Sequence, residues 1–165
     1  MDLTALLKAM GLCLMAVLIE ALSVTKRGRL WFEQLKRPRY SFSLRIWYLV
    51  GAIYYIIFGI IGYRQFSSRL GFSSATVFLL VAVMILNGLS NFIIFKYRSL
   101  QWFYLVIYPF GLLLLTLIII LAPYDKLSAI LASAYFLWLI YDIYYSYKLW
   151  KLNCWRFWTL DIFTN

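Results

Sequence analysis

The 165-residue sequence contains no histidine, six acidic residues, three prolines and two cysteines. The absence of histidine excludes histidine-ligated metal sites, Ser-His-Asp triads and histidine proton relays. The two cysteines, Cys13 and Cys154, lie in a predicted membrane span and near the C-terminus, so we expect packing residues or free thiols and no disulfide. No GxGxxG, P-loop or CxxC motif is present, and we expect neither a metal site nor an obligatory cofactor.

Hydrophobic residues make up 65% of the sequence and charged residues 13%, whereas an ordinary soluble domain has about 45–50% and about 25%. This composition is typical of an integral membrane protein. Because a membrane-spanning helix needs about 20 residues, the chain has room for five such helices with short connectors and for no separate soluble domain. We therefore predict an all-α fold, an integral membrane bundle of five transmembrane helices.

The predicted spans are long apolar runs that cover residues 3–24, 46–63, 72–95, 102–121 and 127–150. A signal peptide is the competing interpretation of the first run. That run is long, contains Glu20 and lacks a clear small-residue cleavage site, so we interpret it as a retained span. Residues 1–153 form the predicted membrane domain, and residues 154–165 form an aromatic tail that we expect along the membrane interface or against a partner.

The connector between the first two spans, residues 25–45, is basic and aromatic. Four cations lie close together in it, and Pro38 forbids a continuous helix through its middle. These cations are Lys36, Arg37, Arg39 and Arg45. Because polar residues are unfavourable in hydrocarbon, we expect this connector to fold as a lid over one end of the bundle.

The basic residues are distributed unequally between the two ends of the predicted bundle. Twelve of the sixteen fall in the first connector, after the third span and near the C-terminus, and the opposite end holds Lys8, Arg64, Arg69 and Lys126. The positive-inside rule then places the lid and the C-terminus in the cytoplasm and the N-terminus outside. This topology and anionic lipid headgroups account for the net charge of +10, so no nucleic-acid partner is expected. We expect the plasma membrane of a bacterium or the membrane of an organelle.

Polar residues within the third span form one candidate site. Asn87 and Asn91 are spaced i, i+4 and so lie on one helical face, with Ser90 beside them. Such residues either line a pocket or join helices by hydrogen bonds worth about 0.6–2 kcal/mol each. Both interpretations stay open for these three residues.

The fifth span carries a second candidate face. Tyr135, Trp138, Asp142 and Tyr145 recur at helical spacing. Aromatic residues near a span end often form an interfacial belt, but a carboxylate within a span costs about 2.5 kcal/mol or more. We therefore expect Asp142 to face a pocket, where it meets either a lid cation or the ligand. Glu20 lies nearer the interface and is expected either to pair there or to join the pocket.

Several motifs resemble those of one membrane-protein family. Trp31-Phe32, Leu35-Lys36-Arg37-Pro38-x-Tyr40, Tyr55 and Gly59 are similar to the WY…L.KP.W…LY..MG pattern of the TspO/MBR family, the tryptophan-rich sensory or translocator proteins. Leu86-Asn87 resembles the LN of that family's third span. Ala134-Tyr135-Phe136-Leu137-Trp138 and Trp150-Lys151-Leu152-Asn153 resemble its PYL.W…W..N ending. The matches keep their order over residues 31–153.

The resemblance implies a five-helix bundle whose first connector covers a pocket for tetrapyrroles such as protoporphyrin IX, for haem, or for a sterol or another lipid. It also implies homodimers or a larger membrane complex. The pocket residues that it implies are Phe32, Pro38, Tyr55, Asn87, Asn91, Tyr135, Trp138 and Asp142. A flat macrocycle would stack on the aromatic faces, and lid cations would meet its propionates.

The sequence also departs from the family pattern. Phe42-Ser43 replaces paired prolines, Tyr40 replaces a tryptophan, and Gly51 replaces a second-span tryptophan that is implicated with the one at Trp138 in light-dependent porphyrin breakdown. Trp47 lies one helical turn earlier. We therefore expect a non-enzymatic protein that binds, transports or senses a hydrophobic ligand, less suited to a dianionic porphyrin. The alternative is an accessory subunit of a larger assembly.

Overall fold

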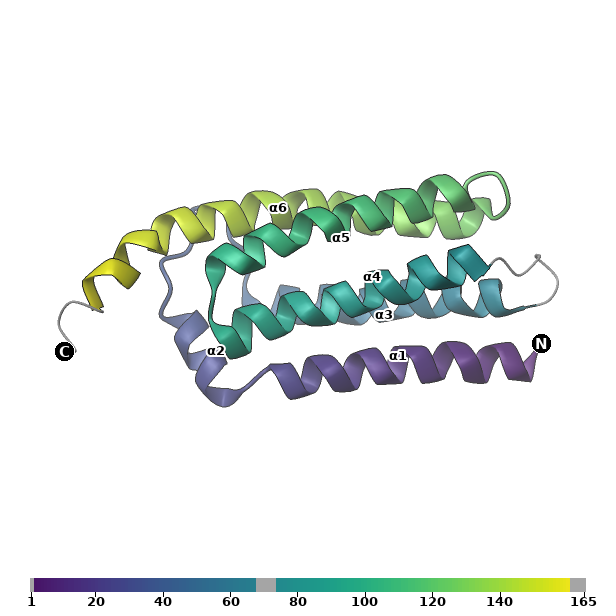
Figure 1. Cartoon of the computed structure of the whole chain (residues 1–165), viewed down its shortest axis with the longest axis horizontal. Coiled ribbons are helices and arrows are strands. Elements are labelled where there is room, and N and C mark those ends of the chain that lie inside the picture. The colour runs from purple at the N-terminus through teal and green to yellow at the C-terminus, as the bar shows by residue number, and fades with distance from the viewer. Residues whose placement is uncertain (1, 68–73, 161–165) are drawn as a thin grey trace.

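The computed structural model describes residues 2–67 and 74–160, and these residues form helices joined by short connectors, without a strand. The helices are α1 (Leu3–Ser23), α2 (Lys26–Glu33), α3 (Leu44–Phe66), α4 (Ser74–Phe92), the π-helical turn η2 (Ile93–Tyr97), α5 (Leu100–Leu121) and α6 (Lys126–Leu160) (Figure 1). Five segments are long and apolar enough to cross a membrane: α1, α3, α4 with η2, α5, and α6 as far as Cys154. The predicted all-α bundle of five transmembrane helices is confirmed.

The helix ends differ from the predicted spans by a few residues. α3 begins at Leu44, two residues before the predicted start of the second span. The predicted start of the third span, Phe72, lies outside the described residues. α6 is one continuous helix across residues 153 and 154, where we placed the start of the aromatic tail, and residues 161–165 of that tail lie outside the described residues.

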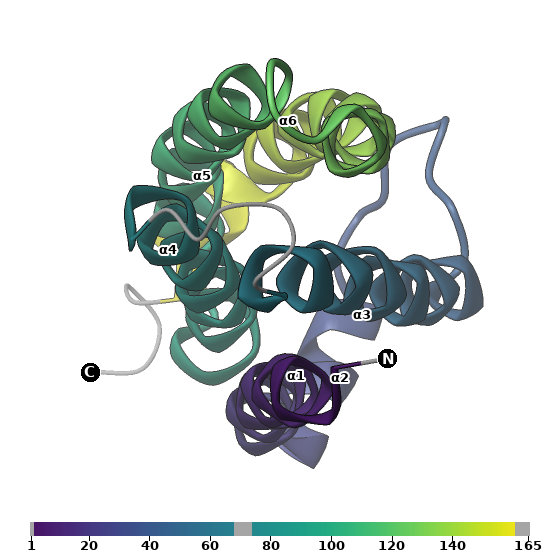
Figure 2. The ribbon, with the colours of Figure 1, turned by 90° about the vertical axis from the view of Figure 1, so that its right-hand side faces the viewer.

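The five long helices form a ring in the order α1, α3, α6, α5 and α4, and each helix packs on its two neighbours (Figure 2). Buried side chains fill its centre, among them Tyr54, Phe58, Ile61, Leu80, Val83, Leu114, Leu117 and Leu139. Large apolar side chains such as Leu112, Ile119 and Leu137 are exposed on its outer surface. Such a surface suits lipid tails, and the protein is an integral, multi-pass membrane protein.

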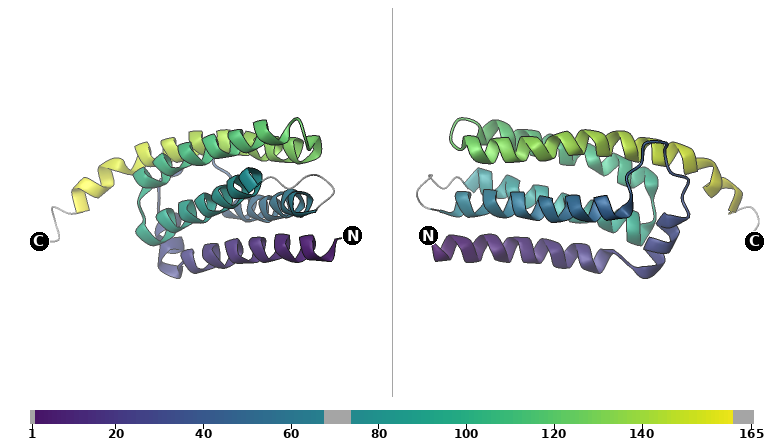
Figure 3. Two further views of the ribbon diagram at one scale, coloured as in Figure 1. Left: turned by 45° about the vertical axis from the view of Figure 1, so that its right-hand side comes forward. Right: turned by 180° about the vertical axis from the view of Figure 1, so that it is seen from behind.

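The connector packs on one end of the ring. Its helix α2 begins at the N-cap Thr25, whose hydroxyl accepts a hydrogen bond from the Gly28 amide at 3.0 Å. α2 then approaches η2 so closely that a Cβ atom on Gly28 would lie 2.0 Å from the carbonyl oxygen of Phe95. Residues 34–43 extend from α2 toward α6 and return to the start of α3 (Figure 3). Pro38 lies in this non-helical segment, as predicted.

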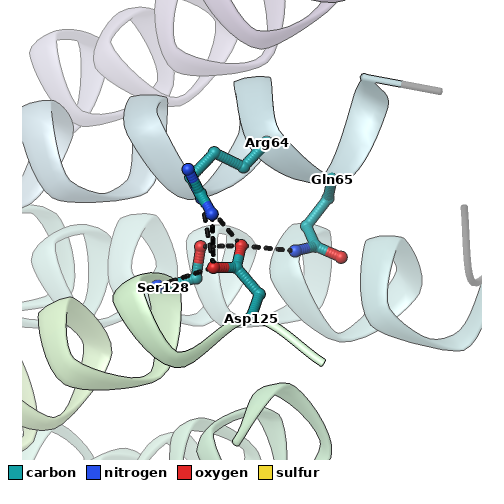
Figure 4. Close-up of polar contacts among 4 residues, drawn as sticks. All are labelled: Arg64, Gln65, Asp125 and Ser128. Atoms are coloured by element: carbon teal, nitrogen blue, oxygen red, sulfur yellow. Dashed lines mark hydrogen bonds and ion pairs between the residues drawn. The ribbon is translucent and has the colours of Figure 1, made fainter. Parts of the chain in front are cut away.

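A polar network joins two helices at the opposite end of the bundle. The Arg64 guanidinium, near the end of α3, donates to both carboxylate oxygens of Asp125 at 2.8–3.1 Å (Figure 4). Gln65 donates its side-chain amide to the same carboxylate at 3.3 Å. Ser128 donates its hydroxyl at 2.6 Å and its backbone amide at 3.2 Å, so Asp125 also caps the start of α6. Asp125 therefore ties the α5–α6 turn to α3.

These contacts set the charge state of Asp125, which lies in the turn outside the spans. Burial alone would raise the pKa of its carboxyl group, but the hydrogen bonds from Arg64 and Ser128 outweigh burial and hold that pKa below its ordinary value. The carboxylate is therefore ionised throughout the physiological pH range.

The orientation of the bundle is testable with single cysteines. In a variant without Cys13 and Cys154, we expect Tyr124→Cys, at a turn residue that is 76% exposed, to react with an impermeant maleimide in intact cells. Glu33→Cys, in the exposed part of α2, should react only after the cells are permeabilised, because the positive-inside rule predicts that the basic end faces the cytoplasm. Labelling measured by gel shift, with the cysteine-free protein as the control, checks this. The reverse pattern would contradict the orientation.

Candidate ligand-binding site

A cavity of ≈110 Å³ lies at the connector end of the bundle, and side chains from all five long helices and from the connector line it. Its walls are mainly aromatic: Phe32, Trp47, Tyr48, Tyr54, Phe95, Phe103, Tyr135, Trp138 and Tyr145. Two carboxylates, Glu20 and Asp142, and two amides, Asn87 and Asn91, supply its polar groups. An apolar pocket with a few convergent polar groups is the usual form of a small-molecule site.

The structure brings most of the predicted site residues together. Those that line this cavity are Phe32, Asn87, Asn91, Tyr135, Trp138 and Asp142. Pro38 is buried within the connector but does not line the cavity. Tyr55 does not line it either, because neighbouring positions on a helix point about 100° apart and Tyr54 takes the inward direction. Tyr55 instead lines a neighbouring groove.

The α6 wall places Asp142 between aromatic side chains. Trp138, Asp142 and Tyr145 follow one another at i, i+4 and i+7, which puts them on one face of the helix, and all three line the cavity. Asp142 thus lines the cavity, and its role there stays a prediction. We expected Asp142 to meet either a lid cation or the ligand. Among the described residues, no lid cation forms an ion pair with Asp142.

Three buried polar atoms at this cavity have no hydrogen-bond partner among the described residues. They are Asp142 Oδ1, the Tyr54 hydroxyl and Trp47 Nε1. A buried polar group without a partner costs about 1–3 kcal/mol, and native proteins keep few of them. Their convergence on one cavity indicates a place where a ligand or ordered water completes the hydrogen bonds.

The connector covers part of the aromatic wall. The ring of Phe42 stacks on Trp138 with centroids 5.7 Å apart, and Trp47 meets Trp138 edge to face at 5.2 Å. Trp47 also packs on Tyr145 at 5.1 Å. Trp47 therefore lies in the cavity wall, one helical turn before Gly51. Gly51 is the position at which the family pattern has a tryptophan. The hydroxyl of Tyr141 donates to the Tyr40 backbone oxygen at 3.0 Å and holds this part of the connector near α6.

The polar residues of α4 bond within their own helix. The Ser90 hydroxyl and the Asn91 amide donate to the backbone oxygen of Asn87 at 2.7 and 3.3 Å. Among the described residues neither side chain donates a hydrogen bond to another helix, which favours the pocket interpretation over the interhelical one. η2 follows directly, and π-helical turns often occur at functional sites.

A groove of ≈360 Å³ adjoins the cavity between α1 and α3. The two spaces share the lining residues Glu20, Val24, Trp47, Tyr48 and Gly51. The hydroxyl of Tyr55 donates to Glu20 Oε2 at 2.5 Å, which fixes one carboxylate oxygen of Glu20 at this junction. Glu20 therefore belongs to the site, although its position near a span end left that open.

Asn153 fastens the connector to α6. Its side-chain oxygen accepts a hydrogen bond from the Lys36 backbone amide at 3.0 Å, and its nitrogen donates to the Lys36 carbonyl at 3.0 Å and to Leu149 at 2.8 Å. Asn153 is fully buried. The sequence signal for this contact was the match of Trp150–Asn153 to a family motif, which carried no role for the asparagine.

The part of the chain that the structure describes offers no metal site and no disulfide. No group of three or more potential metal ligands occurs there, and Cys13 and Cys154 are free thiols. The arrangement therefore suits binding, through aromatic contact and a few hydrogen bonds.

Comparison with known proteins agrees with this architecture. The sequence matches the TspO/MBR family over residues 9–151, which includes all five membrane segments in whole or in part. No curated protein matches the sequence significantly. Because the family match covers most of its length, the chain belongs to the TspO/MBR family.

Proposed function

We propose that this protein binds a hydrophobic small molecule in the cavity beneath the connector, and that it transports or senses that ligand. The family is generally one of binding and transport proteins, not of enzymes. The observation that carries the proposal is the convergence of three unpartnered buried polar atoms on one aromatic cavity. A ligand that completes those hydrogen bonds recovers the cost of leaving them unpaired.

A tetrapyrrole is one candidate ligand, and it requires the connector to move. Ligand pockets usually measure about 300–1,000 Å³, whereas this cavity measures ≈110 Å³. Phe42 also covers one ring of the wall by stacking on Trp138. A porphyrin would therefore take the place of Phe42 on Trp138 once the connector moves outward. The cations of the connector would then meet its propionates, at a distance from Asp142.

Replacing Trp138 with alanine tests this site. We expect Trp138→Ala to weaken porphyrin or haem binding by about 1–3 kcal/mol, the scale of stacking between flat rings and aromatic side chains. The change in porphyrin absorbance on titration of the purified protein measures the affinity. Trp102→Ala is the matched control, because Trp102 is 65% exposed at the start of α5 and does not line the cavity. Equal affinities in the two variants would place tetrapyrrole binding elsewhere.

A second candidate function is that of an accessory subunit in a membrane assembly, including a homodimer through helix faces. The observation that favours it is the stacking of Phe42 on Trp138, in which a side chain of the connector itself covers part of the cavity wall. Such a protein would bind no ligand in the titrations and would migrate as part of a larger complex in native gels of mild-detergent extracts.

A further inference from the structure

The cavity is acidic. Glu20 and Asp142 are its two ionisable carboxyl groups, and no lysine or arginine is among the described residues that line it. Two arginines of the connector lie over aromatic rings: Arg37 is 5.9 Å from the ring centre of Phe32, a cavity wall residue, and Arg39 is 5.8 Å from that of Tyr40. A carboxylate on a ligand would therefore meet like charge inside the cavity.

Two of the three unpartnered atoms can accept a hydrogen bond, whereas the third, Trp47 Nε1, can only donate one. Asp142 Oδ1 is an acceptor when ionised, and the Tyr54 hydroxyl can accept as well as donate. Tyr54 is 1% exposed, so bulk water does not supply its missing partner. A buried carboxylate is stable only when a cation or several donors accompany it. A protonated amine supplies both the charge and the N–H donors, and the rings of Trp138 and Tyr145 favour a cation beside them.

The two adjoining spaces differ in size, so each would hold a different part of such a ligand. An apolar cavity of about 150 Å³ holds benzene, so the ≈110 Å³ cavity has room for a small head group only. The ≈360 Å³ groove continues from it past Gly51. A Cβ atom on Gly51 would meet no side chain or neighbouring helix within 4 Å, so the path between the two spaces is open there. Among the described residues that line the two spaces, Arg29 is the one cation. It lines the groove and does not line the cavity.

We infer that the ligand of this site is an amphiphilic amine, whose protonated head lies against Asp142 in the cavity and whose apolar body lies in the groove between α1 and α3. This inference rests on the proposed function and specifies the charge and shape of its ligand. Glu20, held by Tyr55 where the two spaces meet, adds a second negative charge along the path of the head.

Three ligands of matched shape and different charge test the inference: phenylbutylamine, phenylbutanol and phenylpentanoate. Binding to the full-length protein in lipid nanodiscs is measured by tryptophan fluorescence, with empty nanodiscs as the control for partition. We expect the amine to bind at least about tenfold more tightly than the alcohol, and the carboxylate to bind most weakly. Asp142→Asn, which keeps the shape of the side chain, should abolish the preference for the amine.

Two further variants separate the parts of the inference. Glu33→Gln removes a carboxylate of the exposed connector and should leave the preference for the amine unchanged, which controls for overall charge. Gly51→Leu fills the open path and should weaken the amine and the alcohol alike. If Asp142→Asn does not fold, Tyr54→Phe serves in its place, since it removes one of the two proposed acceptors and should weaken the amine selectively.

The outcomes distinguish this inference from the proposed function. If the amine and the alcohol bind equally, or if the carboxylate binds most tightly, the inference is overturned and hydrophobic-ligand binding stands. If an amine preference persists in Asp142→Asn, the head does not lie against Asp142 and the inference is overturned as well. If none of the three ligands and no tetrapyrrole binds, the proposed function fails with it.

Discussion

Arg64→Met is expected to lower the free energy of unfolding by about 2 kcal/mol, between the values for an exposed and a buried ion pair, because the Arg64 side chain is 30% exposed. The substitution keeps most of the apolar stem but leaves the Asp125 carboxylate, whose side chain is 2% exposed, without its cation. Ser128 and Gln65 still donate to it, but they carry no charge. Because the pair joins the end of α3 to the α5–α6 turn, its loss loosens one end of the bundle.

Unfolding in detergent micelles, followed by the reaction of Cys13 with a thiol-reactive dye, measures this effect. Lys126→Met is the matched control, since it removes an exposed cation beside Asp125 that forms no ion pair among the described residues. We expect a change of no more than about 0.5 kcal/mol there. An Arg64→Met protein as stable as the control would mean that the ion pair contributes no net stability.

The same network gives stability a specific dependence on pH. A folded-state pKa below the unfolded value of about 3.9 contributes stability that is fully present above that value and is lost as the pH falls toward the folded pKa. The wild-type protein should therefore lose stability below about pH 4. Asp125→Asn should be less stable at neutral pH and should lose less on acidification, because it lacks the ionised contacts with Arg64 and Ser128 that lower the pKa.

The sequence predicted the membrane architecture well because hydropathy is a local property. Each predicted span corresponds to a helix of at least 18 residues with an apolar window. The length of α6 was not predictable in this way, because the segment after Trp150 mixes basic and aromatic residues and leaves the apolar run, yet it continues the helix. Hydropathy reports where a helix can lie in lipid, and it does not report where the helix ends.

The sequence predicted the site only in part. Spacing shows which residues share a face of a helix, but it does not show whether that face points into the bundle. Asn87, Asn91, Trp138 and Asp142 share faces by their i, i+4 spacing, and those faces do meet at the cavity. Tyr54 and Tyr55 are adjacent, and nothing in the sequence shows which of them turns inward. The contacts of Arg64 with Asp125 and of Lys36 with Asn153 join residues 61 and 117 positions apart, beyond the reach of any local pattern.

Asn153→Ala is expected to release the connector from the bundle. The substitution removes three hydrogen bonds from a fully buried side chain, two of them to the backbone of Lys36. At about 1 kcal/mol each, the two bonds to Lys36 contribute about 2 kcal/mol to the docked state of the connector. Release of the connector at Lys36 allows Phe42 to leave the Trp138 ring, so the substitution should increase access to the cavity.

Hydrogen exchange of the connector measures this release directly. Amides of residues 34–43 should exchange more than about tenfold faster in Asn153→Ala, and porphyrin should associate faster, because the open connector is the state that admits it. Cys154→Ala is the control at the neighbouring position, since the Cys154 thiol donates only to the Lys151 carbonyl of its own helix at 3.2 Å. Faster exchange without faster association would show that the ligand reaches the cavity by another path, and the groove between α1 and α3, which Phe42 does not line, provides one. Unchanged exchange would show that the connector stays closed without Asn153. The ring contact between Phe42 and Tyr141 and the hydrogen bond from Tyr141 to Tyr40 would then hold it on α6.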